Sequence, residues 1–228
     1  VSDGWSVPWD TTTVTNGTYD LTAQATDTAG NSSTATAVQI TVDNIDELPT
    51  VSVLQPIADA LLANTVTVTA SANDDNGVQQ VEFFVNANSI GVDTNSSDGW
   101  SVSWDTTTSA DGGQVITATA LDTGAQTASS SVVNVIVDNT APVISISGPA
   151  GGSTESGTIT VSASASDATS DVTQVEFFVN GNSIGVDTNV SDGWSVPWDT
   201  TTVTNGTYDL TAQATDTAGN SSTATAVQ

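Results

Sequence analysis

The chain has 228 residues and a formal net charge of −26, because it contains 26 acidic residues and no Lys, Arg or His. Without a basic residue it can form no internal salt bridge and neutralise no phosphate, which excludes nucleic-acid binding and attachment to anionic membranes. The absence of Cys excludes disulfides and thiolate metal sites, and no apolar run approaches the ~20 residues that membrane insertion requires.

The sequence repeats itself with a period of about 94 residues. Asp3, Asp98 and Asp192 hold the same place in three copies of the motif SDGW, and residues 190–228 are identical to residues 1–39. We therefore expect three segments in tandem, all cut from a longer array. They are the C-terminal half of a unit (1–48), a complete unit (49–140) and a unit that lacks its last strand (141–228).

Apolar and polar residues alternate along the complete unit, which predicts strands rather than helices. In TVTVTASA, for example, Val66, Val68 and Ala70 share one face and the Thr residues share the other. Turn residues separate the alternating runs. Seven strands are predicted, near residues 51–55, 65–72, 78–86, 88–94, 100–105, 114–121 and 129–137. This pattern favours an all-β fold of seven-stranded antiparallel Ig-like sandwiches, arranged as a linear array.

Three longer motifs support a family resemblance: VEFFVNxNSIGVDTN, SDGWSVxWDTTT and NGTYDLTAQATDTAGN. Together they resemble the Big-type bacterial Ig-like repeats that occur in tandem in large secreted and surface proteins. The resemblance covers essentially the whole chain. It implies an extracellular or cell-surface location and a role as a spacer, adhesive module or accessory domain. Tyr19 and Tyr208 occupy the place of a tyrosine-corner residue, whereas the complete unit has Gln114 there.

Each unit carries two Trp residues four positions apart with a Val between them, as in Trp100 and Trp104. Such a pair could form a platform for sugars, but residues at this spacing share one face of a strand, and we favour core packing. Phe84 and Phe178 are the better candidates for exposed aromatic side chains. No enzyme is expected, since His, Cys and Lys are absent and the carboxylates lie mostly in turns.

The acidic residues predict a metal site. In an Ig-like sandwich the incoming linker meets three loops of the unit at the same end, and here both the linkers and these loops carry acids. Six to eight oxygens around Ca²⁺ at each junction are therefore geometrically reasonable. The predicted ligands are Asp43, Asn44, Asp46, Glu47, Asp74, Asp75, Asp98, Asp122, Asp138, Asn139, Asp167, Asp171, Asp192 and Asp216. The linker also loosely resembles the calcium linkers of cadherins, in its Asp-Asn pair and following Pro.

The alternative interpretation of these acids is that Asp, Asn and Gly are simply turn residues. For the whole chain we expect a structural extender of an extracellular filament, fibre or adhesin stalk, stiffened by calcium. Its partners would be neighbouring repeats or identical chains in a fibre, with glycans or a cell surface contacted by domains outside this chain. The alternative function is a non-catalytic carbohydrate-binding or spacer module of a secreted hydrolase.

Overall fold

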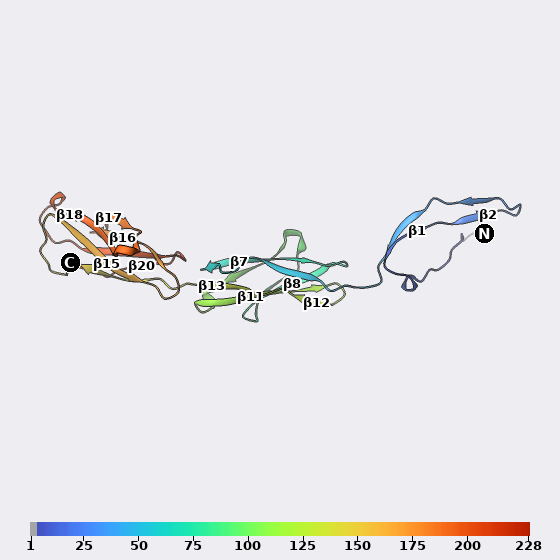
Figure 1. Cartoon of the computed structure of the whole chain (residues 1–228), viewed down its shortest axis with the longest axis horizontal. Coiled ribbons are helices and arrows are strands. Elements are labelled where there is room, and N and C mark those ends of the chain that lie inside the picture. The colour runs from blue at the N-terminus through green and yellow to red at the C-terminus, as the bar shows by residue number, and fades with distance from the viewer. Residues whose placement is uncertain (1–3) are drawn as a thin grey trace.

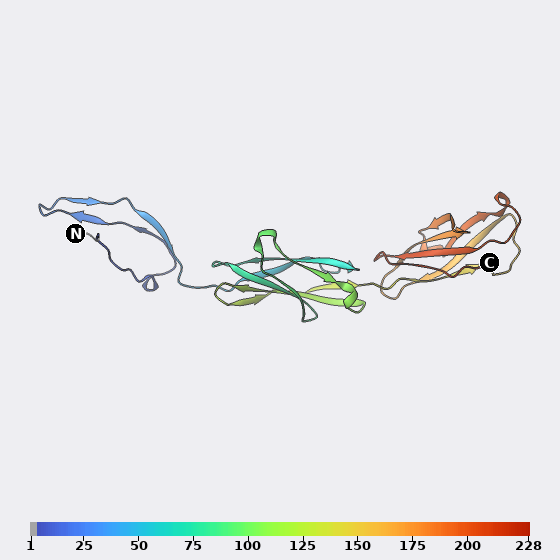
Figure 2. The same cartoon turned by 180° about the vertical axis from the view of Figure 1, so that it is seen from behind.

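The computed structural model describes residues 4–228, and its regular elements are strands joined by short 3₁₀ turns. Residues 1–3, the start of the predicted segment 1–48, lie outside the described residues. Figures 1 and 2 show an elongated array in which a half-unit, a middle unit and a last unit follow one another end to end. The all-β fold and the tandem Ig-like sandwiches predicted from the sequence are confirmed.

The middle unit is built from two facing sheets. One has the strand order β10-β7-β5, and the other has the order β6-β13-β11-β8-β9 with β12 beside β11. All pairings are antiparallel except that of β6 with β13. The strands are β5 (Thr50–Gln55), β6 (Leu61–Leu62), β7 (Thr65–Asn73), β8 (Val78–Val85), β9 (Asn88–Asp93), β10 (Trp100–Asp105), β11 (Gly112–Asp122), β12 (Thr127–Ser129) and β13 (Val133–Val137).

The core lies between the sheets and follows the alternation of the sequence. Successive side chains of a strand point to opposite faces, so every second residue of β8 and β11 enters the core. Val68, Phe83 and Ile116 are fully buried, and Trp100 and Trp104 are only 7% and 2% exposed. The core role expected for the Trp pair is therefore confirmed in this unit. Phe84, on the opposite face from Phe83, is half-buried.

The structure differs from the predicted strands in two places. The predicted strand 129–137 is divided into β12 and β13, because the segment between them has one residue more than the facing part of β11, which runs from Ile116 (paired with Val133) to Thr119 (paired with Ser129). In addition, β6 pairs in parallel with β13. Two residues are too few to show alternation in a sequence, so this strand gave no signal.

The last unit repeats the architecture, with sheets of order β14-β15-β18 and β17-β16-β19-β20. The Tyr208 hydroxyl donates to the Thr204 carbonyl (2.6 Å), as a tyrosine corner does. In the middle unit Gln114 Nε2 donates to the Ala110 carbonyl (2.7 Å), so the amide makes the equivalent bond. The strands are β14 (Val143–Gly148), β15 (Thr158–Ser166), β16 (Val172–Val179), β17 (Asn182–Asp187), β18 (Trp194–Asp199), β19 (Leu210–Asp216) and β20 (Ser221–Thr223).

The first half-unit contains β1 (Gly17–Leu21) paired with β4 (Val38–Val42), and β2 (Gln24–Thr26) paired with β3 (Ser32–Thr34). Its sequence is also present in the last unit, where Trp194 is 5% exposed, yet the matching Trp5 is 97% exposed. The reason is that β18 pairs with β15, and residues 4–48 contain no strand equivalent to β15. Burial of these Trp residues therefore depends on the facing half of the unit.

Short 3₁₀ turns follow the last Trp of each unit. In each, the Asp carboxylate of the motif WDTTT accepts the backbone N–H two residues later. The turns are η1 (Thr11–Thr13), η3 (Thr106–Thr108) and η5 (Thr200–Thr202), with two further turns before the first Trp, η2 (Ser96–Asp98) and η4 (Val190–Asp192). The motif is thus a capped turn that closes the strand.

We predict that Phe83→Ala lowers the free energy of unfolding of the middle unit by about 3–5 kcal/mol, because it leaves a cavity at a fully buried position. Phe84→Ala, which removes the same ring from the half-buried face of the same strand, is the matched control and should have a much smaller effect. Differential scanning calorimetry of the whole chain measures both. Equal losses for the two variants would contradict the assignment of the core.

Candidate metal centres

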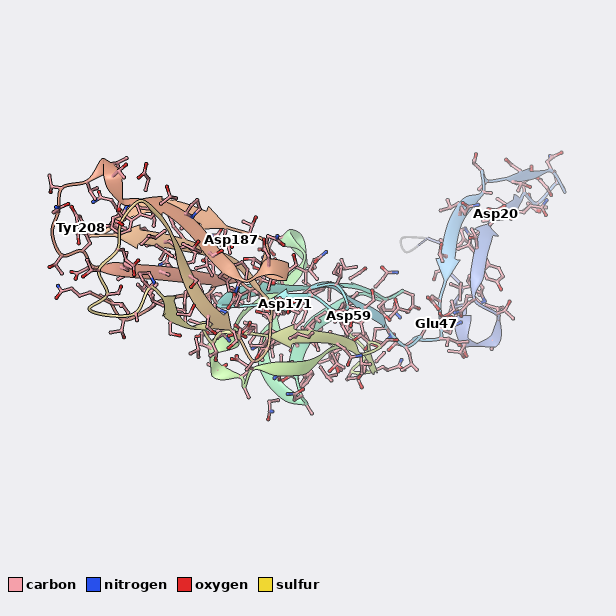
Figure 3. The ribbon with its side chains drawn as sticks, turned by 60° about the vertical axis from the view of Figure 1, so that its left-hand side comes forward. Asp20, Glu47, Asp59, Asp171, Asp187 and Tyr208 are labelled. Carbon is pink, nitrogen blue, oxygen red and sulfur yellow. The ribbon has the colours of Figure 1, made fainter. Side chains whose placement is uncertain are left out.

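The topology brings acidic loops and linkers together at one end of the middle unit and at one end of the last unit. In the middle unit, the loop after β7 and the turn between β11 and β12 lie where the linker 43–49 enters. In the last unit, the loop after β15 and the turn between β19 and β20 lie where the linker 138–142 enters. Figure 3 shows Glu47 on the first linker, and shows Asp171 and Tyr208 toward opposite ends of the last unit.

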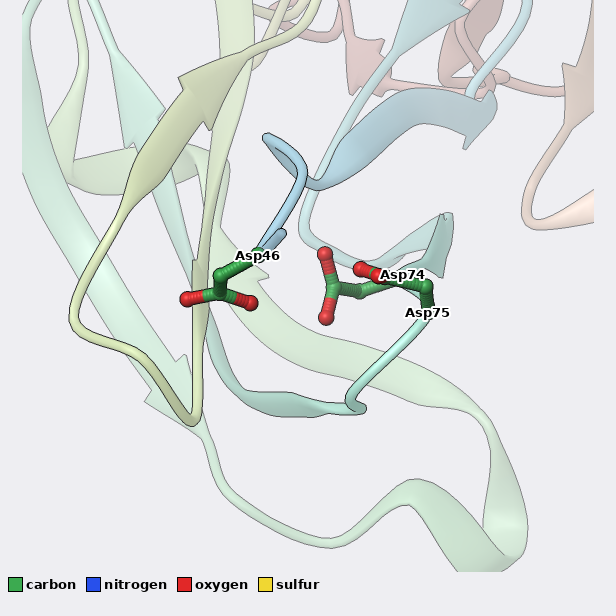
Figure 4. Close-up of side chains that lie close together, drawn as sticks. All are labelled: Asp46, Asp74 and Asp75. Carbon is green, nitrogen blue, oxygen red and sulfur yellow. The ribbon is translucent and has the colours of Figure 1, made fainter. Parts of the chain in front are cut away.

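The first cluster consists of Asp46 from the linker and Asp74 and Asp75 from the loop after β7 (Figure 4). One carboxylate oxygen of each lies within 4.8 Å of the others. Neutral amides hold Asp46 in place: Asn76 Nδ2 donates to its Oδ1 (2.9 Å), and Gln126 Nε2 donates to its backbone carbonyl (2.8 Å). The linker is thus bound to both loops.

The surroundings of this cluster shift the pKa values of two of its members in opposite directions. The pKa of Asp75 is raised above its ordinary value, first by burial of the carboxyl and further by Asp43 and Asp74, against a lowering hydrogen bond from the Glu47 N–H. The side-chain amides of Gln126 and Asn76 lower the pKa of Asp46. Asp74 Oδ2 is buried without a hydrogen-bond partner. The cluster therefore has a buried carboxylate oxygen, Asp74 Oδ2, to which no group of the protein donates.

The second cluster consists of Asp138 from the linker, Asp167 from the loop after β15 and Asp216 at the end of β19, with the same 4.8 Å limit between their carboxylate oxygens. It is more enclosed, because Asp138 is 0% and Asp216 is 3% exposed. Asn220 donates its backbone N–H to Asp216 Oδ1 (2.8 Å) and its side-chain amide to the Asp138 carbonyl (3.0 Å). Asp138 Oδ1 accepts the Thr140 N–H (3.2 Å), whereas Asp138 Oδ2 is buried with no partner.

The remaining predicted ligands lie outside these two clusters. Asn44 and Asn139 bind the preceding unit: Asn44 Nδ2 donates to the Thr11 carbonyl (2.7 Å), and Asn139 Oδ1 accepts the Asn64 N–H (2.8 Å). Asp122 is fully buried in its turn, and its Oδ1 accepts the Gln126 N–H (2.8 Å) while its Oδ2 has no partner. The others are Asp43, which bonds to Asn16; Glu47, whose N–H donates to Asp75; and the exposed Asp98, Asp171 and Asp192.

The sequence analysis did not include Gln126 and Asn220, whose side-chain amides hold the linker carbonyls of Asp46 and Asp138. One signal was available. Both close the same turn, and the first half-unit has Asn31 at the corresponding place. An amide at the same position in three repeats indicates a shared role.

The donor set of both clusters is all oxygen: carboxylates, with backbone carbonyls beside them. Hard cations such as Ca²⁺ prefer such ligands. An unpaired buried carboxylate oxygen is costly, and the chain has no Lys, Arg or His that could approach it. The buried, unpartnered Asp138 Oδ2 therefore fits a bound cation, and the three carboxylates of its cluster would supply part of the coordination.

The sequence matches two family models. The model of the bacterial Ig domain matches residues 49–136 and 142–212, and that of the bacterial Ig-like domain matches residues 1–44. No curated protein matches the chain. Within residues 4–228, no helix has the length and apolar character needed to span a bilayer.

Several solved structures are similar in fold at low sequence identity. The fibronectin(III)-like modules of CbhA from Clostridium thermocellum are 20% identical over 77% of this chain and 92% of theirs, with a TM-score of 0.45. A structure of a 1.5-MDa bacterial ice-binding adhesin is 20% identical over 91% of this chain and 71% of its own, with a TM-score of 0.46. The endo-beta-1,4-mannanase from Thermotoga petrophila is 22% identical over 40% of this chain and 20% of its own, with a TM-score of 0.34.

The two sandwiches have a core of alternating strands, and the bacterial Ig domain model matches most of each. The resemblance noted in the sequence is therefore confirmed, and the chain belongs to the bacterial Ig domain family.

Proposed function

We propose that this chain is an extender segment of an extracellular repetitive protein, such as a surface filament, fibre or adhesin stalk, and that calcium stiffens its junctions. The tandem, end-to-end arrangement of units supports the structural role (Figure 1). The observation that carries the calcium hypothesis is Asp138 Oδ2, which is buried and unpartnered beside Asp167 and Asp216. Neighbouring repeats, or identical chains in a fibre, are the partners that this role requires.

The placement of the second cluster explains how an ion would stiffen the joint. Asp138 belongs to both sides of the junction, since its N–H donates to the Leu62 carbonyl (2.9 Å) of the middle unit and its carbonyl accepts from Asn220 (3.0 Å) of the last unit. A cation held by Asp138, Asp167 and Asp216 would therefore tie the linker to two loops of the next unit. Without a cation, three carboxylates at this distance repel one another.

A catalytic role is not part of the proposal. The chain has no His, Cys or Lys to activate a nucleophile, and its buried carboxylates lie at the joints between units. Carboxylates at a joint suit a structural ion better than acid–base chemistry, because an ion needs only convergent oxygens.

A second candidate function is a carbohydrate-binding accessory module. At the other end of the last unit, a hollow of about 390 Å³ is lined by Trp198, Tyr208, Asn180 and Asn182, among others. Aromatic faces and amides are side chains that suit a sugar ring. A hollow of about 390 Å³ lies at the equivalent place of the middle unit. Titration with soluble oligosaccharides, followed by Trp fluorescence, separates the candidates, since the extender function predicts no saturable change.

We predict that calcium raises the thermal stability of the chain, and that Asp138→Asn removes the part of this effect that belongs to the last unit. Bound ligand stabilises by about 2.7 kcal/mol when its concentration is about 100 times the dissociation constant. In chelator the same variant should be as stable as the parent or more stable, because it removes a buried unpaired charge. Calorimetric unfolding in calcium and in chelator measures both effects.

Asp98→Asn is the matched control for this experiment, because Asp98 is an exposed acid of the middle unit outside both clusters. It should leave the calcium effect unchanged. If Asp138→Asn responds to calcium as the parent does, the second cluster is not a calcium site, and the acids are turn residues only.

We also predict that electron microscopy shows straight rods in calcium and bent, flexible chains after chelation, because repulsion between junction carboxylates is no longer offset. Asp138→Asn should abolish the response at the second joint and preserve it at the first. Rods of equal straightness in both conditions would leave an extender whose stiffness comes from protein contacts alone.

A further inference from the structure

The turn between β11 and β12 of the middle unit has an inverted sequence. It contains Gly124 followed by Ala125, where the other units have Ala followed by Gly. Those units place the glycine in a left-handed conformation, with φ of 91° at Gly30 and 90° at Gly219. The middle unit keeps the same conformation, with φ of 69°, but puts Ala125 there. The backbone is conserved between units while the two residues have exchanged places.

The exchange is unfavourable for the turn itself. A left-handed conformation brings Cβ of an L-residue close to the following carbonyl oxygen, and only Gly adopts it freely. A left-handed alanine alone is weak evidence, because the middle unit has another at Ala87, where the last unit has Gly181. At that hairpin the glycine is simply replaced. In the turn after β11 it has moved by one position, so the new position must be considered.

The space at the new position is filled by the linker. A Cβ atom built on Gly124 would lie 1.6 Å from Asp46 Oδ2 and 2.7 Å from Asp46 Cγ, far inside van der Waals contact. Asp46 has little freedom to move away, because Asn76 holds its Oδ1 and Gln126 holds its carbonyl. The linker in this position therefore requires glycine at residue 124.

The second joint is built differently. Its linker, 138–142, is two residues shorter than the first linker, 43–49. In the first joint Asp43 bonds to Asn16 of the preceding half-unit and Asp46 contacts the following unit. In the second joint Asp138 makes both contacts. The turn of the last unit has Ala218 at the position of Gly124, and the shorter linker is compatible with that methyl group.

We propose that Gly124 and Ala125 make the middle unit a specific receptor for the aspartate of the longer linker, so that the two joints are not interchangeable. The longer linker fits only a unit with the Gly-Ala turn, and this pairing fixes how the first half-unit is seated on the middle unit. The pairing rests on shape and on hydrogen bonds from the neutral amides of Asn76 and Gln126. It therefore operates with or without a bound cation, and it is independent of the calcium hypothesis.

The test is to restore the common order with the double variant Gly124→Ala/Ala125→Gly in the whole chain. The turn regains a left-handed glycine, so the middle unit should melt at the same temperature or higher. The added methyl group should displace Asp46. We expect shifts in the NMR signals of the Asn76 and Gln126 side-chain amides and loss of hydrogen-exchange protection at the Glu47 N–H, which donates to Asp75.

The matched control is Ala218→Gly/Gly219→Ala in the last unit. It should lower the melting temperature of that unit, because it creates a left-handed alanine, and leave the hydrogen-exchange protection of the Thr140 N–H, which donates to Asp138 in the second linker, unchanged. A second variant makes the test independent of folding problems. Asp46→Ala should show the same loss of protection at Glu47, and adding Gly124→Ala/Ala125→Gly to it should cause no further loss.

The proposal is overturned if the middle-unit double variant leaves the Asn76, Gln126 and Glu47 signals unchanged. It is also overturned if the effects of Asp46→Ala and the double variant simply add, because they would then act on different contacts. All measurements are made in calcium and in chelator. A loss seen in both supports the receptor even where the calcium hypothesis fails.

Discussion

The constraint on which this structure depends is that 26 carboxylates have no basic residue to pair with. They must take neutral donors, and within the units several of them accept backbone N–H groups. Asp93 Oδ2 accepts the Ser101 N–H (2.7 Å), and Asp187 Oδ2 accepts the Ser195 N–H (2.8 Å) in the same place of the next unit. Such bonds fix the course of a loop, because each joins a carboxylate to the backbone eight residues further along the chain. The carboxylates therefore help to determine the conformation of the loops.

At the joints this solution is incomplete. Several acids converge there, and although backbone N–H groups donate to one oxygen of each, some of the second oxygens have no donor. Asp138 Oδ2, Asp122 Oδ2 and Asp74 Oδ2 are buried and unpartnered, and all three belong to a linker or to a loop that faces one. The core of each sandwich, in contrast, consists of buried apolar side chains that all come from the same unit. Ionic conditions should therefore act at the joints, on the angle between units and on the stability of the unit whose loops hold the acids.

Much of the fold could be predicted from the sequence, because the alternation of Val81, Phe83 and Val85 directly reports which side chains enter the core. The gathering of acids at one end followed from the order of strands in a sandwich, and two clusters of three are found there. Which of the predicted acids form each cluster could not be predicted from the sequence. It depends on linker length and on the reach of side chains, which alternation does not report.

Two further features depended on context that no local pattern contains. Gln114 stands in the place of the corner tyrosine, and its side-chain amide makes the equivalent hydrogen bond. Because Gln and Tyr are different residue types, the sequence did not reveal this. The segment containing Trp5 is identical in sequence to the one containing Trp194, yet only the second forms a strand and is buried. Local sequence sets the preference for a strand, and the facing sheet decides whether the strand forms.

The comparison of the middle unit with the last unit indicates where an array of such domains can vary. Residues 81–95 and 175–189 differ only at Ala87 and Gly181, and both segments fill the same space between two sheets. A change of volume there would be felt throughout the core. The joints are not bound by this requirement, and there the linkers differ by two residues and the receiving turns differ in sequence. The units supply length, and the joints determine how each unit is oriented on the next, so the mechanical character of the array is encoded in its linkers and in the turns that receive them.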